Sequence, residues 1–202
     1  MKKQLCLTAD IGGTNTRVAL FDNEKLLESS CVTYSNNEYD SFETIIKNYL
    51  DLVSESSVKF AGIAAAGPIQ EKSAKMTNLS WNLTERSIAS ITGAEQVGII
   101  NDLQAQGYGL TSLDKADLEP VTVGSQSANS NATRLVCGIG TGFNAAPVFN
   151  VGHKFFVPPS EAGHSQLSLT DKSYQSVFAK IASVGSFVSV EDILSGRGLE
   201  NV

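Results

Sequence analysis

One arrangement occurs twice in this chain, once near the N-terminus and once beyond the middle. In each place a short apolar run, a turn containing glycine and threonine, and a second apolar run follow one another. The two copies are Leu5–Ala9, Gly12–Asn15 and Arg17–Phe21, and then Leu135–Ile139, Gly140–Gly142 and Ala145–Phe149. Each copy predicts two strands joined by a tight turn. The repetition constrains the fold more than any other feature, because it predicts two halves built on one plan.

Turns of this kind can bind phosphate. Glycine lets backbone N–H groups approach phosphate oxygens, and Thr or Asn side chains add donors, so two turns could hold opposite sides of one polyphosphate. Neither turn has the spacing of a P-loop or a Rossmann fingerprint, and a lone turn is more often a plain hairpin. Asp10, directly before the first turn, favours the ligand-binding interpretation. Mg²⁺ prefers one or two carboxylates together with water and substrate phosphates, so a carboxylate in this position suits a magnesium ion.

The rest of the first half predicts alternating strands and helices. Phe60–Ala66 and Val97–Ile100 are short apolar runs that end in polar residues or glycine, and Leu26–Tyr34 could form a third strand of an antiparallel meander. Apolar residues at helical spacing predict a helix over Phe42–Val53, capped by Asp40 with Glu43 three residues later. The pattern indicates an α/β fold with ligand chemistry at the carboxyl ends of the strands.

The second half begins after a change in composition. The stretch from Thr111 to Thr133 is polar and contains the most linker-like segment, 125–131, so we place a domain boundary near Ser112. The predicted domains are residues 1–112 and residues 113–202. A later helix is indicated by Tyr174, Val177, Phe178 and Ile181, and Ser189 with Asp192 could cap another short helix.

Composition excludes several classes of protein. The 202 residues are 42% hydrophobic, and 15 Lys and Arg against 21 Asp and Glu give a net charge of −6. Because the basic residues are scattered, the chain does not resemble a nucleic-acid-binding protein. Cys6, Cys31 and Cys137 are too few and too far apart for a disulfide framework or a zinc cluster. No apolar run approaches the ~20 residues of a membrane helix, and we expect a cytoplasmic protein without membrane partners.

Seven short motifs, in one order, give a more specific indication. Together they resemble the bacterial glucokinase family, in the hexokinase group of the actin-like ATPase (ribonuclease H-like) superfamily. The motifs are residues 10–17 (DIGGTNTR), 65–68 (AAGP), 77–81 (TNLSW), 100–102 (IND), 140–142 (GTG), 161–164 (EAGH) and 194–199 (LSGRGL). The resemblance implies an α/β sugar kinase with two domains and a cleft between them. It also implies ATP-dependent phosphorylation of glucose at the 6-hydroxyl, the entry to glycolysis.

The resemblance assigns roles to these positions. Asp102 would be the general base, and the sugar would bind Asn78, Asn101, Asp102, Glu161, His164 and Glu191. ATP would bind Gly12, Gly13, Thr14, Asn15, Gly140, Thr141 and Gly142, with Mg²⁺ at Asp10. From the residues alone, Asn101-Asp102 could instead be a capped turn, His164 a histidine bonded to backbone, and Glu191 an ordinary acid in the first turn of a helix. The lone Trp81 could be core packing, and His153, outside every motif, is interpreted as structural.

Two departures from related sequences bear on these roles. The related repressor and kinase group carries a cysteine-rich zinc motif after Glu-x-Gly-His, whereas no Cys follows Cys137 here, so His164 is free to bind sugar. The second turn is followed by Phe143-Asn144-Ala145, where the family often has a further glycine, which leaves the fine geometry of this turn open.

The length leaves alternatives open. Family members continue through an adenine-binding segment and a closing helix, so this sequence resembles a glucokinase truncated at its C-terminus, with the second domain incomplete. The alternatives are a catalytically impaired sugar-binding fragment or sensor of the same fold, a related hexose kinase, or an α/β scaffold without a ligand. Family members are often homodimers, but no interface signature is evident.

Overall fold

The computed structural model describes residues 4–55, 57–76, 79–121, 132–152, 154–168, 175–182 and 187–201. The chain forms two compact units, Met1–Ala105 and Gln106–Val202. The division lies inside helix α3 (Asp102–Gly109), before the boundary that the sequence placed near Ser112.

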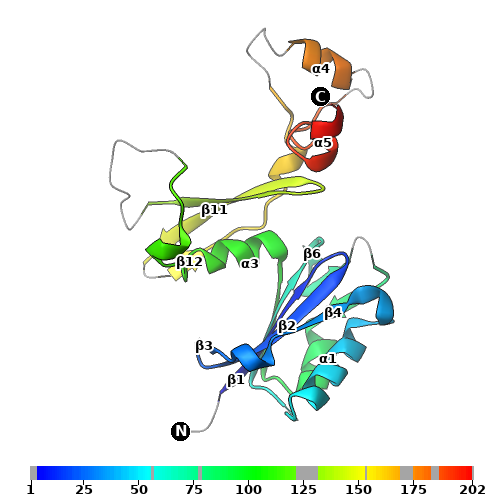
Figure 1. Cartoon of the computed structure of the whole chain (residues 1–202), viewed down its shortest axis with the longest axis vertical. Coiled ribbons are helices and arrows are strands. Elements are labelled where there is room, and N and C mark those ends of the chain that lie inside the picture. The colour runs from blue at the N-terminus through cyan, green and yellow to red at the C-terminus, as the bar shows by residue number, and fades with distance from the viewer. Residues whose placement is uncertain are drawn as a thin grey trace. The chain divides into compact units, whose positions relative to one another are not determined.

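The first unit is built on a six-stranded sheet (Figure 1) with the order β3-β2-β1-β5-β9, and β4 also pairs with β2. Strands β1 and β2 are antiparallel, whereas β1, β5 and β9 are parallel neighbours. The strands are β1 (Leu5–Ile11), β2 (Asn15–Asp22), β3 (Lys25–Leu26), β4 (Val32–Ser35), β5 (Phe60–Ala65) and β9 (Gln96–Asn101). The strands predicted at 5–9, 17–21, 60–66 and 97–100 are therefore confirmed.

The single strand predicted over Leu26–Tyr34 is wrong. The chain forms β3, then a 3-10 helix η1 (Glu28–Ser30), then β4, and both strands pair with β2. The buried Ser30 explains the interruption. Its hydroxyl accepts a hydrogen bond from the Leu20 amide at 2.9 Å and donates to the Leu27 carbonyl at 2.5 Å, so it replaces a strand partner while the chain turns.

The core of the first unit lies between one face of the sheet and helices α1 (Phe42–Leu52) and α2 (Glu85–Thr92). Alternate residues of β1 are buried, as a half-buried strand requires: Leu5, Leu7, Ala9 and Ile11. Helix α1 confirms the predicted helix, but its cap is Ser41 rather than Asp40. The Ser41 backbone is extended and its hydroxyl accepts from the Thr44 amide at 3.3 Å, the arrangement that an N-cap requires.

A small antiparallel sheet was not predicted, because its strands have only two or three residues each. They are β6 (Ile69–Gln70), β7 (Ser73–Lys75) and β8 (Asn82–Thr84). Trp81 lies directly before β8 and is 5% exposed. It is therefore a core residue, which is the interpretation that the sequence analysis gave.

The second unit contains the antiparallel sheet β10-β11-β12, formed by Arg134–Ile139, Phe143–Val151 and Lys154–Phe156. The strands predicted at 135–139 and 145–149 are confirmed. Helix α4 (Gln175–Ala182) confirms the later helix, and η3 (Lys115–Asp117), η4 (Ala162–His164) and α5 (Gly196–Asn201) complete the unit. Gly107 of α3 faces Val136 and Val157, because an added Cβ there would lie within 3.3 Å of both side chains.

The short helix predicted from Ser189 is wrong, since the chain forms a turn there. The Asp192 carboxylate accepts hydrogen bonds at 2.8 Å from both the amide and the hydroxyl of Ser189. These bonds lower the pKa of Asp192 below its usual value, and Arg197 adds a smaller contribution. The Ser189 hydroxyl therefore donates to Asp192 instead of capping a helix, and the next helix begins at Gly196.

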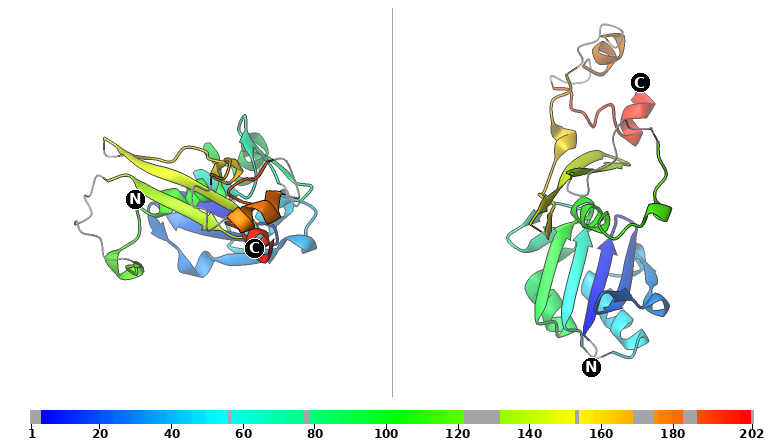
Figure 2. Two further views of the ribbon diagram at one scale, coloured as in Figure 1. Left: turned by 90° about the horizontal axis from the view of Figure 1, so that it is seen from above. Right: turned by 90° about the vertical axis from the view of Figure 1, so that its left-hand side faces the viewer.

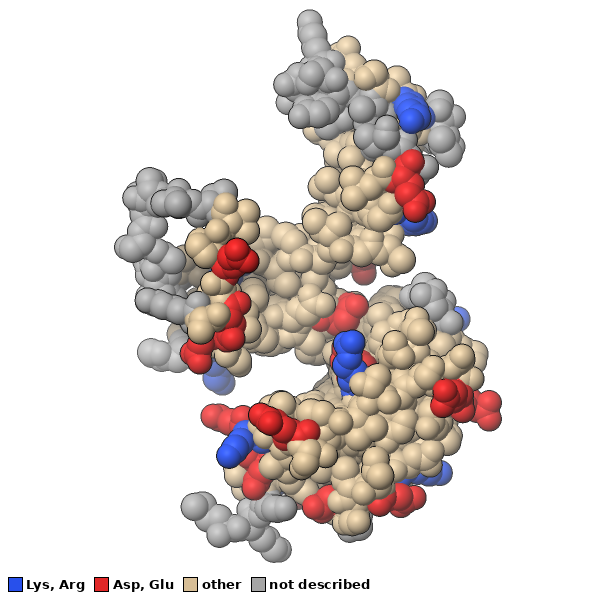
Figure 3. Space-filling view, in the orientation of Figure 1, with Lys and Arg blue, Asp and Glu red and all other residues tan. Residues whose placement is uncertain are grey.

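None of the helices in the described ranges is both long and apolar enough to span a lipid bilayer. On the face drawn in Figure 3, Lys and Arg side chains occur singly among acidic ones and form no broad basic patch.

Candidate active site

The three parallel strands of the first unit place their carboxyl ends along one edge of the sheet. In register, Ile11 pairs with Ala65, and Ala65 pairs with Asn101. Figure 2 (right) shows these strands side by side. Asp10, the loop that begins at Ala66 and the Asn101-Asp102 pair therefore meet at this edge, where α/β sheets usually bind ligands.

The first turn, Gly12–Asn15, is closed by a hydrogen bond from the Gly12 amide to the Asn15 carbonyl at 3.0 Å. Gly13, Thr14 and Asn15 are exposed. Within the described residues, no acceptor is recorded for the amides of Gly13 and Thr14. Exposed backbone donors of this kind suit an anion such as a phosphate group.

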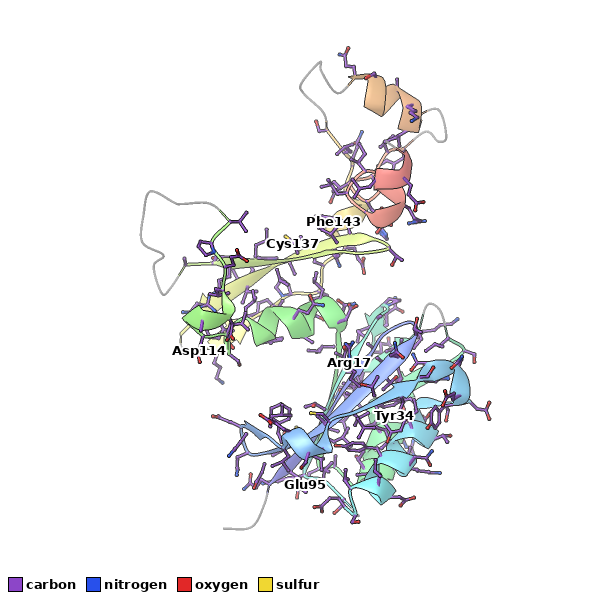
Figure 4. All side chains as sticks on the ribbon, viewed as in Figure 1. Arg17, Tyr34, Glu95, Asp114, Cys137 and Phe143 are labelled. Atoms are coloured by element: carbon purple, nitrogen blue, oxygen red, sulfur yellow. The ribbon has the colours of Figure 1, made fainter. Side chains whose placement is uncertain are left out.

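Asp10 lies beside this turn and pairs with Arg17 on the neighbouring strand. The Arg17 Nη1 atom is 3.5 Å from Asp10 Oδ2, and the two side chains are 71% and 54% exposed. Figure 4 labels Arg17 on β2. An exposed pair of this kind is weak, so the Asp10 carboxylate can exchange Arg17 for another cation. A cavity of about 290 Å³, lined by residues of β1 and β2 and by Cys31–Thr33, opens against both side chains.

A metal site at Asp10 can be tested against its donors. No group of three or more His, Cys, Asp or Glu side chains with metal-binding geometry occurs among the described residues. A protein-only cage is therefore absent from this part of the chain. One exposed carboxylate beside free amides does fit Mg²⁺ held mainly by water and substrate phosphates.

Asn101 and Asp102 end β9 and begin α3. Asn101 Oδ1 and Asp102 Oδ1 both accept from the Leu103 amide, at 3.0 and 2.8 Å. Asn101 Nδ2 donates to the Gly67 carbonyl at 3.4 Å, which links the pair to the loop after β5. The pair does cap a helix, as one interpretation held. Among the described residues, the recorded side-chain hydrogen bond of Asp102 uses Oδ1 alone. Its Oδ2 atom is therefore available to a ligand.

In the second unit, the turn Gly140–Gly142 joins β10 to β11. The Gly140 amide donates to the Gly142 carbonyl at 2.9 Å, and the Gly140 carbonyl accepts from Gly196 at 2.7 Å. The Glu191 carboxylate supports the end of this turn, because Oε2 accepts from the Phe143 amide at 3.0 Å. Figure 4 labels Phe143 at its place on β11. A Cβ on Gly142 would collide with the same carboxylate, so the Glu191 side chain would have to move to admit a larger residue.

The loop that carries Glu161 and His164 lies against the start of β11. The Ala162 amide donates to Asn144 Oδ1 at 2.9 Å, and Asn144 Nδ2 donates to the Ser160 carbonyl at 2.5 Å. Gly163 is buried, and a Cβ there would collide with the Phe143 carbonyl. Glu161 and His164 are both exposed, so their polar groups are open to a ligand.

Glu191 is engaged more fully than a simple sugar ligand would be. Besides the Phe143 amide, it contacts Arg197 Nη2 at 3.3 Å and lies 4.0 Å from His164 Nε2, both through Oε1. Its side chain is 21% exposed. The second unit thus brings together Glu191, His164 and the second turn.

Asn78 and His153 lie outside the described residues, as does the linker-like segment 125–131. Two structural residues were not identified from the sequence. Asn36 contacts the first turn, and Asn144, noted only as a departure from the family pattern, holds the Glu161 loop. Both residues bond to partners far away in the sequence. A local sequence pattern cannot predict such contacts.

Comparison with known proteins gives one consistent result. A family model described as glucokinase matches residues 7–202. The glucokinase of Chromohalobacter salexigens is 34% identical over 96% of this chain and 60% of its own length. That of Psychromonas ingrahamii is 32% identical over 99% of this chain and 61% of its own. The crystal structure of a glucokinase from an Antarctic psychrotroph has a TM-score of 0.84 at 28% identity, covering 98% of this chain and 62% of that one.

The chain thus spans about three fifths of the length of the curated relatives it matches. The predicted α/β sugar-kinase fold, with the actin-like ATPase architecture, is confirmed. Because the family model covers nearly the whole sequence, this chain belongs to the glucokinase family.

Proposed function

We propose that the protein containing this chain transfers the γ-phosphoryl group of ATP to the 6-hydroxyl of glucose. The observation that carries the proposal is the shared sheet edge in the first unit. There Asp10 and the first turn lie at the end of β1, and Asn101-Asp102 lies where β9 passes into α3. An edge with phosphate donors and an available carboxylate supplies both requirements of phosphoryl transfer, charge stabilisation and a proton acceptor.

Asp102 is the proposed general base. Its Oδ1 atom is held by the Leu103 amide, so the carboxylate has a defined orientation and Oδ2 can accept the proton of the 6-hydroxyl. Asp102 also occupies the first turn of α3, where an acidic side chain interacts favourably with the helix dipole. A positioned base of this kind typically contributes about 10²–10⁴ in rate.

The two turns are the proposed phosphate ligands. Residues Gly12, Gly13, Thr14 and Asn15 would contribute donors from the first unit, and Gly140, Thr141 and Gly142 would contribute donors from the second. Asp10 would hold Mg²⁺ through water, and the ion would neutralise charge on the phosphates when bound.

The proposed sugar ligands are Asn78, Asn101, Asp102, Glu161, His164 and Glu191. Carboxylates, an imidazole and an amide can bridge adjacent hydroxyls of a pyranose. A site built from such groups rejects an analogue that lacks a hydroxyl, because buried polar groups would then be unpaired. The contacts of Glu191 with Phe143 and Arg197 support a second task for this residue, which is to connect the sugar ligands to the second turn.

The test is glucose-dependent release of ADP from MgATP, measured for the wild type and for Asp102→Asn and Asp102→Ala. We expect kcat to fall about 10²–10⁴-fold in both variants. Glucose affinity, measured by calorimetry, should largely survive, because most proposed sugar ligands remain. Asp51→Asn, an exposed aspartate of α1, is the matched control and should retain wild-type kcat.

The other outcomes separate the alternatives. Full activity of Asp102→Ala would contradict the assignment of the base. Glucose binding without phosphoryl transfer by the wild type would favour a sugar-binding protein of the same fold. Two flat titrations, with glucose and with MgATP, would favour a scaffold without ligands.

The proposed setting is the cytoplasm, which the three free cysteines support, since a reducing compartment preserves thiols. The resemblance also implies a homodimer, and sedimentation of the purified protein tests it.

A further inference from the structure

The side chain and the backbone amide of Asn36 direct their recorded hydrogen bonds at the first turn and at Thr16, whereas its carbonyl accepts from the Tyr39 amide within η2. The residue begins the 3-10 helix η2 (Asn36–Glu38), directly after β4, and is 2% exposed. None of the sequence motifs includes it. A buried side-chain amide is costly unless its groups are bonded, so its partners indicate what it does.

Three hydrogen bonds connect Asn36 to the turn and to β2. Its Nδ2 atom donates to the Gly12 carbonyl at 2.9 Å, and its backbone amide donates to the Thr14 carbonyl at 2.8 Å. Its Oδ1 atom accepts from the hydroxyl of Thr16 at 2.7 Å. A carbonyl oxygen can only accept, so the NH₂ group must face Gly12 and Oδ1 must face the hydroxyl.

The bond to the Gly12 carbonyl fixes the direction of a phosphate donor. In a trans peptide unit the carbonyl of one residue and the N–H of the next point in opposite directions. No cis peptide bond occurs among the described residues. Because the Gly12 carbonyl points at Asn36, the Gly13 N–H points away from it, toward the exposed side of the turn.

The anchor of Asn36 is rigid. Thr16 is 0% exposed and belongs to β2, which pairs with β1 on one side and β4 on the other. The first turn is thus held on its buried side by the side chain of Asn36, which is bonded to Thr16 of the sheet. A turn held in this way loses little conformational freedom when a ligand binds.

We propose that Asn36 is a positioning residue that keeps the first turn in its ligand-ready shape and so strengthens binding of the polyphosphate of ATP. The proposal rests on the proposed function, because it takes ATP as the ligand of this turn. A neutral amide suits the position. A carboxylate there would oppose the Gly12 carbonyl and place negative charge behind the bound phosphates.

The experiment compares the wild type with Asn36→Ala and Asn36→Asp. Affinity for MgATP and for glucose is measured by calorimetry, and KM for both is measured by ADP release. We expect Asn36→Ala to weaken MgATP binding about tenfold, the effect of one or two lost hydrogen bonds. Asn36→Asp should weaken it further. Glucose affinity should change less than about twofold, because the residues of the proposed sugar site are untouched.

A pair of Thr16 variants separates hydrogen bonding from packing. Thr16→Val keeps the shape of the side chain but removes the hydroxyl, whereas Thr16→Ser keeps the hydroxyl but removes a methyl group. We expect Val to weaken MgATP binding and Ser to retain it. Asn37→Ala, an exposed neighbour in η2, is the control and should bind as the wild type does.

Amide hydrogen exchange reports the turn without any ligand. The Gly12 amide, bonded to the Asn15 carbonyl, should exchange about tenfold faster in Asn36→Ala, while the Leu7 amide in β1 should be unchanged. Unchanged exchange at Gly12, or equal losses of MgATP and glucose affinity, would overturn the proposal. A wild type that binds MgATP through this turn without transferring phosphate would contradict the proposed function and still support the role of Asn36.

Discussion

The two glycine turns are held in shape by different chemistry. The first is held by the neutral amide of Asn36, which is 2% exposed and anchored to a buried hydroxyl. The second is held by the charged carboxylate of Glu191, which is 21% exposed at the side chain and shared with Arg197. The two halves follow one strand-turn-strand plan, yet the supports of their turns are unrelated.

The difference indicates how each turn should respond to its surroundings. A buried hydrogen bond between neutral groups is insensitive to salt and to pH in the ordinary range. A partly exposed carboxylate forms stronger, charge-assisted bonds, but its contacts weaken with ionic strength and with protonation. The first turn should therefore keep its shape under conditions in which the second loses it.

The largest expected effect comes from a pair of glycine substitutions. Gly163→Ala should reduce the stability of the second unit by about 1–3 kcal/mol, because the new Cβ must displace the Phe143 backbone. Gly12→Ala should change the first unit by less than about 0.5 kcal/mol, since its Cβ would lie 3.4 Å from the Asn15 carbonyl oxygen, an ordinary contact. Native-state hydrogen exchange at Val136 and at Leu7 reports the two units separately. Equal losses would contradict the closer packing around Gly163 than around Gly12.

A smaller effect is expected for Glu191→Gln. The amide can still accept from Phe143, but it loses the charge that strengthens this bond and attracts Arg197. We expect the second unit to lose about 1 kcal/mol. The salt dependence of Phe143 amide exchange should also disappear. Glu200→Gln, an exposed acid of α5, is the control and should keep that dependence. If the amide exchange rate of Phe143 in the wild type does not depend on salt concentration, the charge of Glu191 is not what holds the second turn.

The smallest effect concerns acid. The hydrogen bonds from Ser189 lower the pKa of Asp192 in the folded protein. A carboxylate whose pKa is lowered on folding stabilises the folded state at pH values above its unfolded-state pKa, about 3.9. This contribution is lost as the pH falls through the pKa of the folded state. The stability difference between the wild type and Asp192→Asn should therefore be constant above about pH 5 and shrink below pH 4. The rate of amide exchange at Gly12, corrected for the intrinsic effect of pH, should not change over the same pH range. A parallel change would contradict the inference that the two units are stabilised independently.

The sequence predicted the parts of the fold that depend on local pattern. Alternating burial marked β1, and helical spacing marked α1, whose buried residues include Ile45, Ile46 and Tyr49. The errors occurred where a single side chain changed the path. Ser30 replaced a strand partner, and Ser41 rather than Asp40 took the cap.

The strand pattern also predicted where three of the candidate site residues lie in the fold. Motif residues placed Asp10, Asn101 and Asp102 at strand ends, and the register of β1, β5 and β9 puts those ends along one edge. The supports of the site could not be predicted. Asn36 reaches a carbonyl 24 positions away, and Asn144 bonds an amide 18 positions away. Such contacts depend on the tertiary fold, which leaves no periodic signal in the sequence.

The support from Asn36 has a consequence for protein design. A segment that reads Gly-Gly-Thr-Asn looks like a portable element that could be grafted onto any antiparallel hairpin. Here the orientation of its donors depends on Asn36 and Thr16. Asn36 lies outside the hairpin, in the segment that follows β4. A graft that transfers the four residues alone would reproduce the sequence of the turn but not the orientation of its N–H donors. The smallest transferable unit is the turn together with β2, β4 and the first residue of η2.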